Sequence, residues 1–178
     1  MTAVATTDIK QNQSTSRIGG SAGRSHHLAQ IVSFRLANEE YGLDIMGVQE
    51  IILMGEITGI PEVPPYIRGL INLRGKVIPI VDLRKRFALQ AGEPTEQTRI
   101  VVVNTAACTF GIIVDAVNEV LRIDTEQIEP PPTGLLGREQ AYIKGLVKMK
   151  DKIMILLSTE KMLSQEEQVT LTEAGGQS

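Results

Sequence analysis

Residues 67–87 read IRGLINLRGKVIPIVDLRKRF, which is the pattern of a β-hairpin. The apolar runs Leu70–Leu73 and Val77–Val81 are separated by Arg74-Gly75-Lys76, where glycine can adopt the positive φ that a tight turn needs. Pro79 has no N–H to donate, so the second strand is expected to lie at an edge or to be bulged there. Aliphatic arms and a charged tip predict that the arms close a core while the tip faces a partner.

The same hairpin pattern occurs a second time, at residues 143–163, which read IKGLVKMKDKIMILLSTEKML. Upstream of each copy, residues 31–51 (IVSFRLANEEYGLDIMGVQEI) align without gaps on residues 100–120 (IVVVNTAACTFGIIVDAVNEV). The matched glycines are Gly42 with Gly111 and Gly69 with Gly145. A repeat of about 60 residues buries too little surface to be stable alone, so the two copies are expected to pack together. Short strands with Gly and Pro at their corners favour small curled barrels, because closure removes exposed strand edges.

Two further elements are expected before the first long hairpin. Alternating apolar and polar residues predict another hairpin at residues 31–45, with its turn at Asn38-Glu39-Glu40. Val48, Ile51 and Ile52 recur at helical spacing, which predicts a short amphipathic helix that ends near Gly55. The last element expected is a short helix near the C terminus.

The ends of the chain differ from its middle. Residues 1–28 are rich in Ser, Thr, Gln and Gly without a hydrophobic period, which predicts a disordered N-terminal tail. Residues 169–178 are expected to form a flexible C-terminal tail. A single domain is therefore expected at residues 29–168, built from two intertwined barrel units at about 31–90 and 98–160.

Composition limits the kinds of function. Hydrophobic residues make up 42% of the 178 residues and aromatic residues 3%, so the chain can form one ordinary domain with an aliphatic core. A net charge of −3 gives no overall attraction to polyanions. Cys108 is the only cysteine, and its apolar neighbours predict a small buried side chain rather than a nucleophile. The sequence shows neither a signal peptide nor a membrane-spanning run, and the protein is expected to be cytoplasmic.

The sequence contains no catalytic constellation. A hydrolase needs a histidine fixed beside its nucleophile, and both histidines, His26 and His27, lie in the predicted tail. No cysteine, histidine or carboxylate cluster has ligand spacing, so no metal and no cofactor are expected. The carboxylates of Glu39-Glu40 are expected to be solvated in their turn. The sequence therefore predicts a protein that is not an enzyme and that works through docking surfaces; an enzyme using an unrecognised carboxylate pair is one alternative.

Arg84-Lys85-Arg86 is the main concentration of basic residues. It offers an alternative function, a small β-barrel nucleic-acid-binding module, although such sites usually add stacking aromatics and only Phe87 is near. A solvated face is the simpler interpretation. Glu50 and Arg74 could form an ion pair that orients the hairpin tip, if the predicted first helix packs over the hairpin.

Four segments together strongly resemble the CheW family of chemotaxis coupling proteins. They are EEYGLDIMGVQEI, IRGLINLRGKVIPIVDLRKRF, GIIVDAVNEVL and IKGLVKMKDKIMILL, and the resemblance covers residues 30 to about 165. It implies a mainly β fold of two five-stranded SH3-like barrels that share a hydrophobic core, with short helices and a C-terminal helix. It also implies a non-catalytic cytoplasmic adaptor of bacterial chemotaxis. Such an adaptor joins the histidine kinase CheA, through the regulatory domain of the kinase, to the cytoplasmic tips of methyl-accepting chemoreceptors.

The resemblance also implies two sets of contact residues. The receptor tip would bind in the groove between the barrels, at positions that match Ile45, Val48, Glu50, Arg74 and Val120. The kinase would bind at Arg68, Gly69, Leu135 and Leu136, the leucines being candidate apolar anchors in the loop TGLLGRE. Core packing is the competing interpretation for Val48 and Val120, and backbone geometry is the competing interpretation for Gly69.

Overall fold

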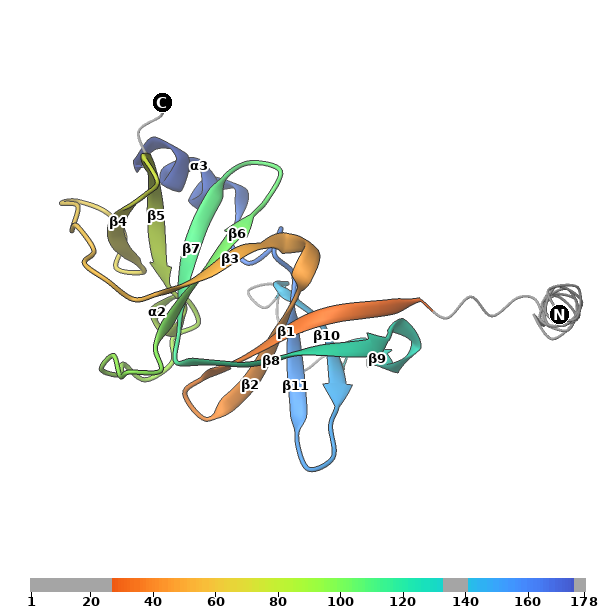
Figure 1. The fold of residues 1–178 in the computed structure, drawn as a ribbon. Helices are drawn as coiled ribbons and strands as arrows, with labels where there is room; N and C mark the ends of the chain where they lie inside the picture. Colours follow the sequence, from red (N-terminus) through yellow and green to blue (C-terminus); the bar gives the residue numbers. More distant parts are fainter. Residues whose placement is uncertain (1–26, 133–140, 175–178) are drawn as a thin grey trace, which may run out of the picture.

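The computed structural model describes residues 27–132 and 141–174, and its strands form two curled sheets (Figure 1). Sheet A has the strand order β8-β1-β2-β11-β10-β9, and sheet B has the order β3-β6-β7-β5-β4. The strands of sheet A are β1 (Leu28–Leu36), β2 (Glu39–Asp44), β8 (Ala116–Asp124), β9 (Ile128–Glu129), β10 (Ile143–Lys148) and β11 (Ile153–Leu157). Those of sheet B are β3 (Val48–Leu53), β4 (Ile67–Leu73), β5 (Lys76–Asp82), β6 (Arg99–Asn104) and β7 (Thr109–Val114).

The two sequence repeats exchange their first hairpins. The β1–β2 hairpin of the first repeat joins the second repeat in sheet A, through a parallel pairing of β2 with β11. The β6–β7 hairpin of the second repeat joins the first repeat in sheet B, through a parallel pairing of β5 with β7. The sheets therefore do not follow the predicted units of about 31–90 and 98–160, because each sheet takes strands from both.

Each sheet is closed by the chain that follows its outer strand. After β3, Thr58 forms an isolated bridge with Leu70 of β4, with both backbone hydrogen bonds at 2.8 Å. After β8, the short strand β9 pairs with β10 in the same way, and Glu129 lies opposite Leu146. The two sheets are thus SH3-like barrels, and β9 is a two-residue addition to the five strands predicted for sheet A.

The β4–β5 hairpin forms as its sequence predicts. Both central residues of its turn have positive φ, 53° at Arg74 and 86° at Gly75, which matches the turn geometry that suits twisted strands. The Asn72 side chain accepts a hydrogen bond from the N–H of Gly75 at 2.8 Å. The β5–β7 ladder begins only at Ile80, so Pro79 lies where β5 has no neighbour on that side, as predicted.

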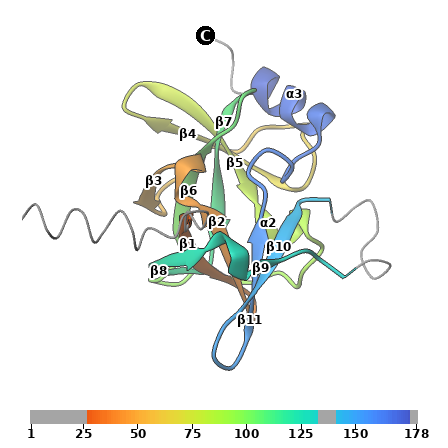
Figure 2. The same ribbon diagram turned by 90° about the vertical axis from the view of Figure 1, so that its right-hand side faces the viewer.

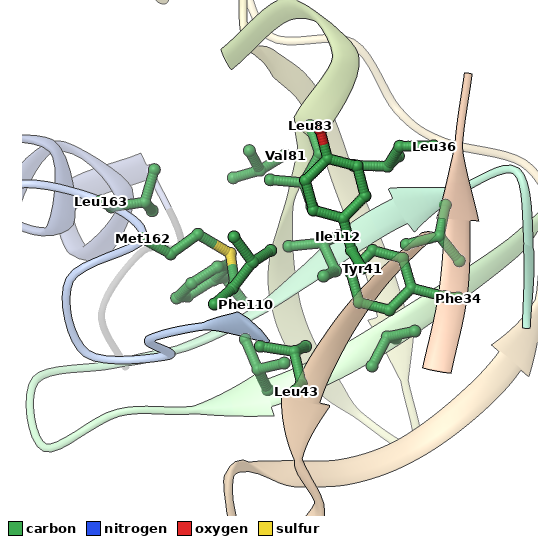
Figure 3. Close-up of a cluster of buried hydrophobic side chains, with 14 of the residues drawn as sticks. Phe34, Leu36, Tyr41, Leu43, Val81, Leu83, Phe110, Ile112, Met162 and Leu163 are labelled. Carbon is green, nitrogen blue, oxygen red and sulfur yellow. The ribbon is translucent and has the colours of Figure 1, made fainter. Parts of the chain in front are cut away.

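The common core fills the space between the two sheets (Figure 3). Side chains alternate along the central strands, and in β6 Val101 and Val103 belong to the common core, while Ile100 and Val102 point into barrel B. Barrel A has its own small cluster around Met154. The largest fully buried members of the common core are Phe34, Leu36, Leu43, Leu83, Phe110, Ile112 and Leu157. Because strands of both sheets contribute side chains to this one cluster, the shared core predicted for the two barrels is present.

The helix predicted around Val48 is wrong. Residues 45–47 form a single 3-10 turn, η1 (Ile45–Gly47), and the chain then continues as strand β3. A bulge between Val48 and Glu50 shifts the register of β3 against β6, so Val48 and Ile51 lie on one face at a spacing of three residues. A spacing of three residues is also typical of a helix, and it is the pairing with β6 that makes this segment a strand. A second 3-10 turn, η2 (Thr125–Gln127), follows β8.

The C-terminal helix is longer than predicted. Helix α3 (Gln165–Ala174) continues through most of the segment 169–178 that was expected to be a flexible tail. Ser164 and Glu167 form a reciprocal capping pair at its start, with hydrogen bonds of 3.1 and 2.7 Å. Leu171 is fully buried in the common core, which holds the helix at the end of sheet B (Figure 2). Residues 1–26 of the predicted N-terminal tail lie outside the described residues.

Candidate docking surface

Strand β3 carries apolar side chains on the face that is directed toward sheet A. Val48 lies opposite Val103 and Ile51 lies opposite Val101, and both partners belong to the common core. Leu53 follows at the next position on that face. Exposure rises along the strand, because Val48 is half-buried against the core, Ile51 is 39% exposed and Leu53 is 70% exposed.

Strand β8 and the turn η1 supply the apolar residues on the other side. Val120 of β8 lies opposite Val32, whose second cross-strand partner, Leu43, belongs to the common core. Val120 is nevertheless 49% exposed, because β8 is an outer strand. In η1, Ile45 is half-buried and Met46 is 88% exposed. Strands β3 and β8 are outer strands of sheet B and sheet A, and both lie close to the region where the two sheets adjoin (Figures 1 and 2).

We call these residues the junction surface: Ile45, Met46, Val48, Ile51, Leu53 and Val120. Three of these residues, Ile45, Val48 and Val120, belong to the predicted receptor site. Met46, Ile51 and Leu53 were not predicted from the sequence. If residues 45–53 are interpreted as an outer strand, they contain more apolar residues than its one buried face can hold. That excess is the sequence signal that could have identified Met46, Ile51 and Leu53.

Glu50 and Arg74 form the predicted ion pair, but from a strand rather than a helix. Nη1 and Nη2 of Arg74 donate to the two carboxylate oxygens of Glu50, each at 2.6 Å. These hydrogen bonds hold the pKa of Glu50 below its ordinary value and raise the pKa of Arg74. Because side chains alternate along β3, Glu50 projects from the face opposite to Ile51. The pair therefore ties β3 to the tip of the β4–β5 hairpin.

The predicted kinase-binding residues are only partly placed. Arg68 is exposed on β4, which is the outer strand of sheet B. Gly69 is buried with a φ of 149°, and a Cβ there would come within 2.2 Å of the carbonyl oxygen of Thr58. Backbone geometry thus accounts for this glycine. Leu135 and Leu136 lie outside the described residues.

Two of the three residues in the basic cluster are engaged in ion pairs. Arg84 is bound by Asp115, at 2.5 Å between Nη2 and Oδ2, and this hydrogen bonding raises the pKa of Arg84. Arg86, in helix α2 (Leu83–Arg86), is bound by Glu167 of α3. Lys85 is exposed. With two of the three charges compensated within the chain, the cluster offers little for a phosphate backbone, which argues against the nucleic-acid alternative.

The other polar candidates have structural roles. Glu40 is buried rather than solvated, and its carboxylate accepts hydrogen bonds from Asn118 at 2.8 Å and Lys152 at 3.3 Å. Cys108 is half-buried, and burial raises the pKa of its thiol, which makes it a weak nucleophile. Within residues 27–132 and 141–174, no three His, Cys, Asp or Glu side chains are grouped so that they could hold a metal ion. None of the helices in the same residues has the length and apolar character needed to cross a membrane.

Comparison with known proteins identifies relatives of the same architecture. The family profile described as CheW-like domain matches residues 30–167. The chemotaxis protein CheW of Klebsiella aerogenes is 41% identical over 138 residues, which cover 78% of this chain and 83% of that protein. The CheW of Treponema pallidum is 36% identical over 144 residues, covering 78% of this chain and 84% of that protein. The crystal structure of the scaffolding protein TtCheW from Thermoanaerobacter tengcongensis has a TM-score of 0.71 and 41% identity, and the match covers 81% of this chain and 94% of that one. The chain therefore belongs to the CheW-like family of chemotaxis scaffold proteins.

Proposed function

We propose that this protein is a non-catalytic cytoplasmic adaptor that couples chemoreceptors to the histidine kinase CheA. The observation that carries the proposal is the junction surface, where Met46, Leu53 and Val120 are exposed in a protein of a chemotaxis scaffold family. Large apolar side chains gathered on a surface are typical of a docking site for another protein.

The junction surface suits an amphipathic helix. Such a helix lays its apolar face against an apolar strip, and charged groups beside the strip fix its register. The receptor partner would be the helical cytoplasmic tip of a methyl-accepting chemoreceptor. Glu50 and Arg74 hold the strand that carries Ile51 and Leu53, and Arg74 remains 70% exposed although it is paired, so it can also meet a carboxylate of the partner.

The kinase partner would bind elsewhere on the chain, through its regulatory domain. Arg68 on the outer strand β4 is the described residue that supports this contact. Gly69 would contribute by keeping β4 in position, and Leu135 and Leu136 remain candidate apolar anchors. Because coupling has to be reversible, each contact is expected to be micromolar, or about −8 kcal/mol, and to be multiplied by avidity in an array.

The test compares two equally exposed, β-branched apolar residues that lie at different places in sheet A. Val120→Glu changes the junction surface, and Ile153→Glu changes an equally exposed residue of β11; the wild-type side chains are both 49% exposed. Val120→Glu is expected to weaken binding of a receptor tip fragment by about tenfold or more, because the carboxylate would be buried without a partner. Ile153→Glu is expected to leave that affinity unchanged.

Affinities can be measured by isothermal titration calorimetry, with circular dichroism as the control for folding. A pull-down of wild-type protein with both the receptor fragment and the kinase regulatory domain should yield a ternary complex. Equal affinity of the two variants would refute the docking surface. Failure of wild-type protein to bind either partner would refute the proposed function itself.

A further inference from the structure

Asp115 stands at the crossover from sheet B to sheet A, between β7 and β8. Its carboxylate accepts hydrogen bonds from Arg84, through Nε at 3.0 Å and Nη2 at 2.5 Å, and from the backbone N–H of Ala37 at 2.7 Å. Its own N–H donates to the carbonyl of Arg35 at 2.9 Å. One side chain therefore joins α2, which continues sheet B, to the β1–β2 turn of sheet A.

Arg84 is held in place from its other side as well. Its Nη1 donates to the carbonyl of Gln90 at 2.7 Å. The chain then passes directly over the guanidinium, since a Cβ at Gly92 would come within 2.6 Å of Nη1. Both partners of the ion pair are about one-fifth exposed. A planar guanidinium bound at all three nitrogens is a directional link, in contrast to the non-directional apolar core.

Within the described strands, the chain crosses between the sheets twice, from β7 to β8 through Asp115 and from β2 to β3 through η1. We call these the first and the second junction, and the sequence duplication allows them to be compared. The repeat alignment matches Ala37 with Ala106, Arg84 with Glu160 and Asp115 with Met46. In this second junction the N–H of Ala106 is also bound by a carboxylate, that of Glu160, at 3.1 and 3.2 Å. The turn amide is thus satisfied in both junctions.

The two junctions differ in whether the crossover itself is tied. At the first junction Asp115 is part of the crossover and carries the ion pair. At the second junction the crossover residue is Met46, which is 88% exposed. A cavity of about 560 Å³ opens beside Met46 and Glu160, whereas the cavity beside Arg84 and Asp115 has about 210 Å³.

We propose that Arg84 and Asp115 are positioning residues, which fix the two barrels relative to each other at the crossover between β7 and β8. Because β8 begins directly after Asp115, this link also sets where Val120 lies relative to the apolar residues of β3. The consequence for receptor binding rests on the proposed function, but the geometric part does not.

The test measures the distance between the barrels directly. Spin labels are attached at Val77→Cys and Ile153→Cys in a Cys108→Ser background; these are matched positions in β5 and β11, 50% and 49% exposed. Double electron–electron resonance then gives the distribution of distances in wild-type protein, Arg84→Gln, Asp115→Asn and the double variant. Asn can still accept from Ala37, so only the ion pair is lost.

Each single variant is expected to broaden the distribution, and the double variant to broaden it no further, because either change breaks the same link. A label pair within sheet A, Val120→Cys with Ile153→Cys, should remain unchanged. The matched control is Glu129→Gln, which removes an ion pair with Lys148 that lies wholly within sheet A. Unchanged distributions in both single variants would overturn the proposal.

Two further measurements keep the outcome clear. If either single variant loses its circular dichroism spectrum, Arg84→Lys, which keeps the charge but not the paired hydrogen bonds, should still broaden the distribution. A wild-type distribution in Arg84→Lys would then overturn the proposal. Asp115→Asn should also weaken binding of the receptor fragment severalfold, without being a contact residue. Broadened distances with unchanged affinity would refute the positioning role, whereas wild-type protein that binds no receptor fragment would refute the proposed function.

Discussion

Gly69→Ala should destabilise the protein strongly, although it adds only one methyl group. The glycine has a φ of 149°, and an added Cβ would come within 2.2 Å of the Thr58 carbonyl oxygen. That oxygen accepts the N–H of Leu70 in the bridge that closes barrel B. The obstacle is backbone, so it cannot be relieved by a change of rotamer, and the segment around Thr58 has to move away from β4.

The expected loss has two parts. Placing alanine at this φ costs about 1–3 kcal/mol. Breaking the two backbone hydrogen bonds of the bridge costs about 0.5–1.5 kcal/mol each. The sum, about 2–6 kcal/mol, is a large share of the roughly 5–15 kcal/mol that stabilises a typical domain.

The repeat provides the control, Gly145→Ala. Gly145 lacks the left-handed φ of Gly69, and its closest obstacle is a side-chain methyl of Ile128 at 2.6 Å, with the Glu129 carbonyl oxygen at 2.9 Å. Overpacking of this kind costs about 1–3 kcal/mol. Urea unfolding followed by circular dichroism suits a protein without tryptophan. If Gly145→Ala were as destabilising as Gly69→Ala, the argument from backbone conformation would be wrong.

Two further predictions concern α3 and the ion pair at the hairpin tip. Leu171→Ala should lower the free energy of unfolding by about 2–5 kcal/mol, because the side chain is fully buried. Val169→Ala, at a position that is 56% exposed, should change it by less than about 0.5 kcal/mol. Similar losses for the two variants in urea unfolding would contradict the docking of α3 through Leu171. Arg74→Ala should raise the pKa of Glu50 toward its ordinary value, and an NMR titration that shows the same Glu50 midpoint in both proteins would contradict this. Since the folded-state pKa is the lowered one, the stabilisation is present above the unfolded-state pKa and is lost as the pH falls through the folded-state pKa.

The hairpins could be predicted from the sequence because their causes are local. Arg74 and Gly75 take up positive φ within the turn itself, and the aliphatic runs on either side need only each other to form a ladder. The helix predicted around Val48 failed for an equally specific reason. The bulge after Val48 places residues three apart on one face, and nothing local distinguishes a bulged outer strand from a helical turn.

The exchange of hairpins between the repeats could not be predicted in the same way. It depends on the parallel pairings of β2 with β11 and of β5 with β7, which join distant segments. Because the two repeats have similar sequences, the first hairpin of each repeat could pair with the second hairpin of either one. The choice between the two arrangements depends on long-range contacts that exist only in the folded chain.

The candidate site shows why resemblance and physics find different residues. The family pattern pointed to Glu50, Arg74 and Val120 as receptor-binding residues; in the structure Glu50 and Arg74 are paired with each other and Val120 is 49% exposed. Met46 was missed because only a comparison of the two junctions explains why it is exposed. At the matched position the Asp115 carboxylate binds Arg84 and the N–H of Ala37, and a methionine side chain cannot form these bonds. The duplication therefore yields one crossover that fixes the barrels and one that leaves an apolar side chain exposed. Under the proposed function, in which the protein holds two partners at once, both features have a use: a fixed angle between the barrels and an adaptable contact beside it.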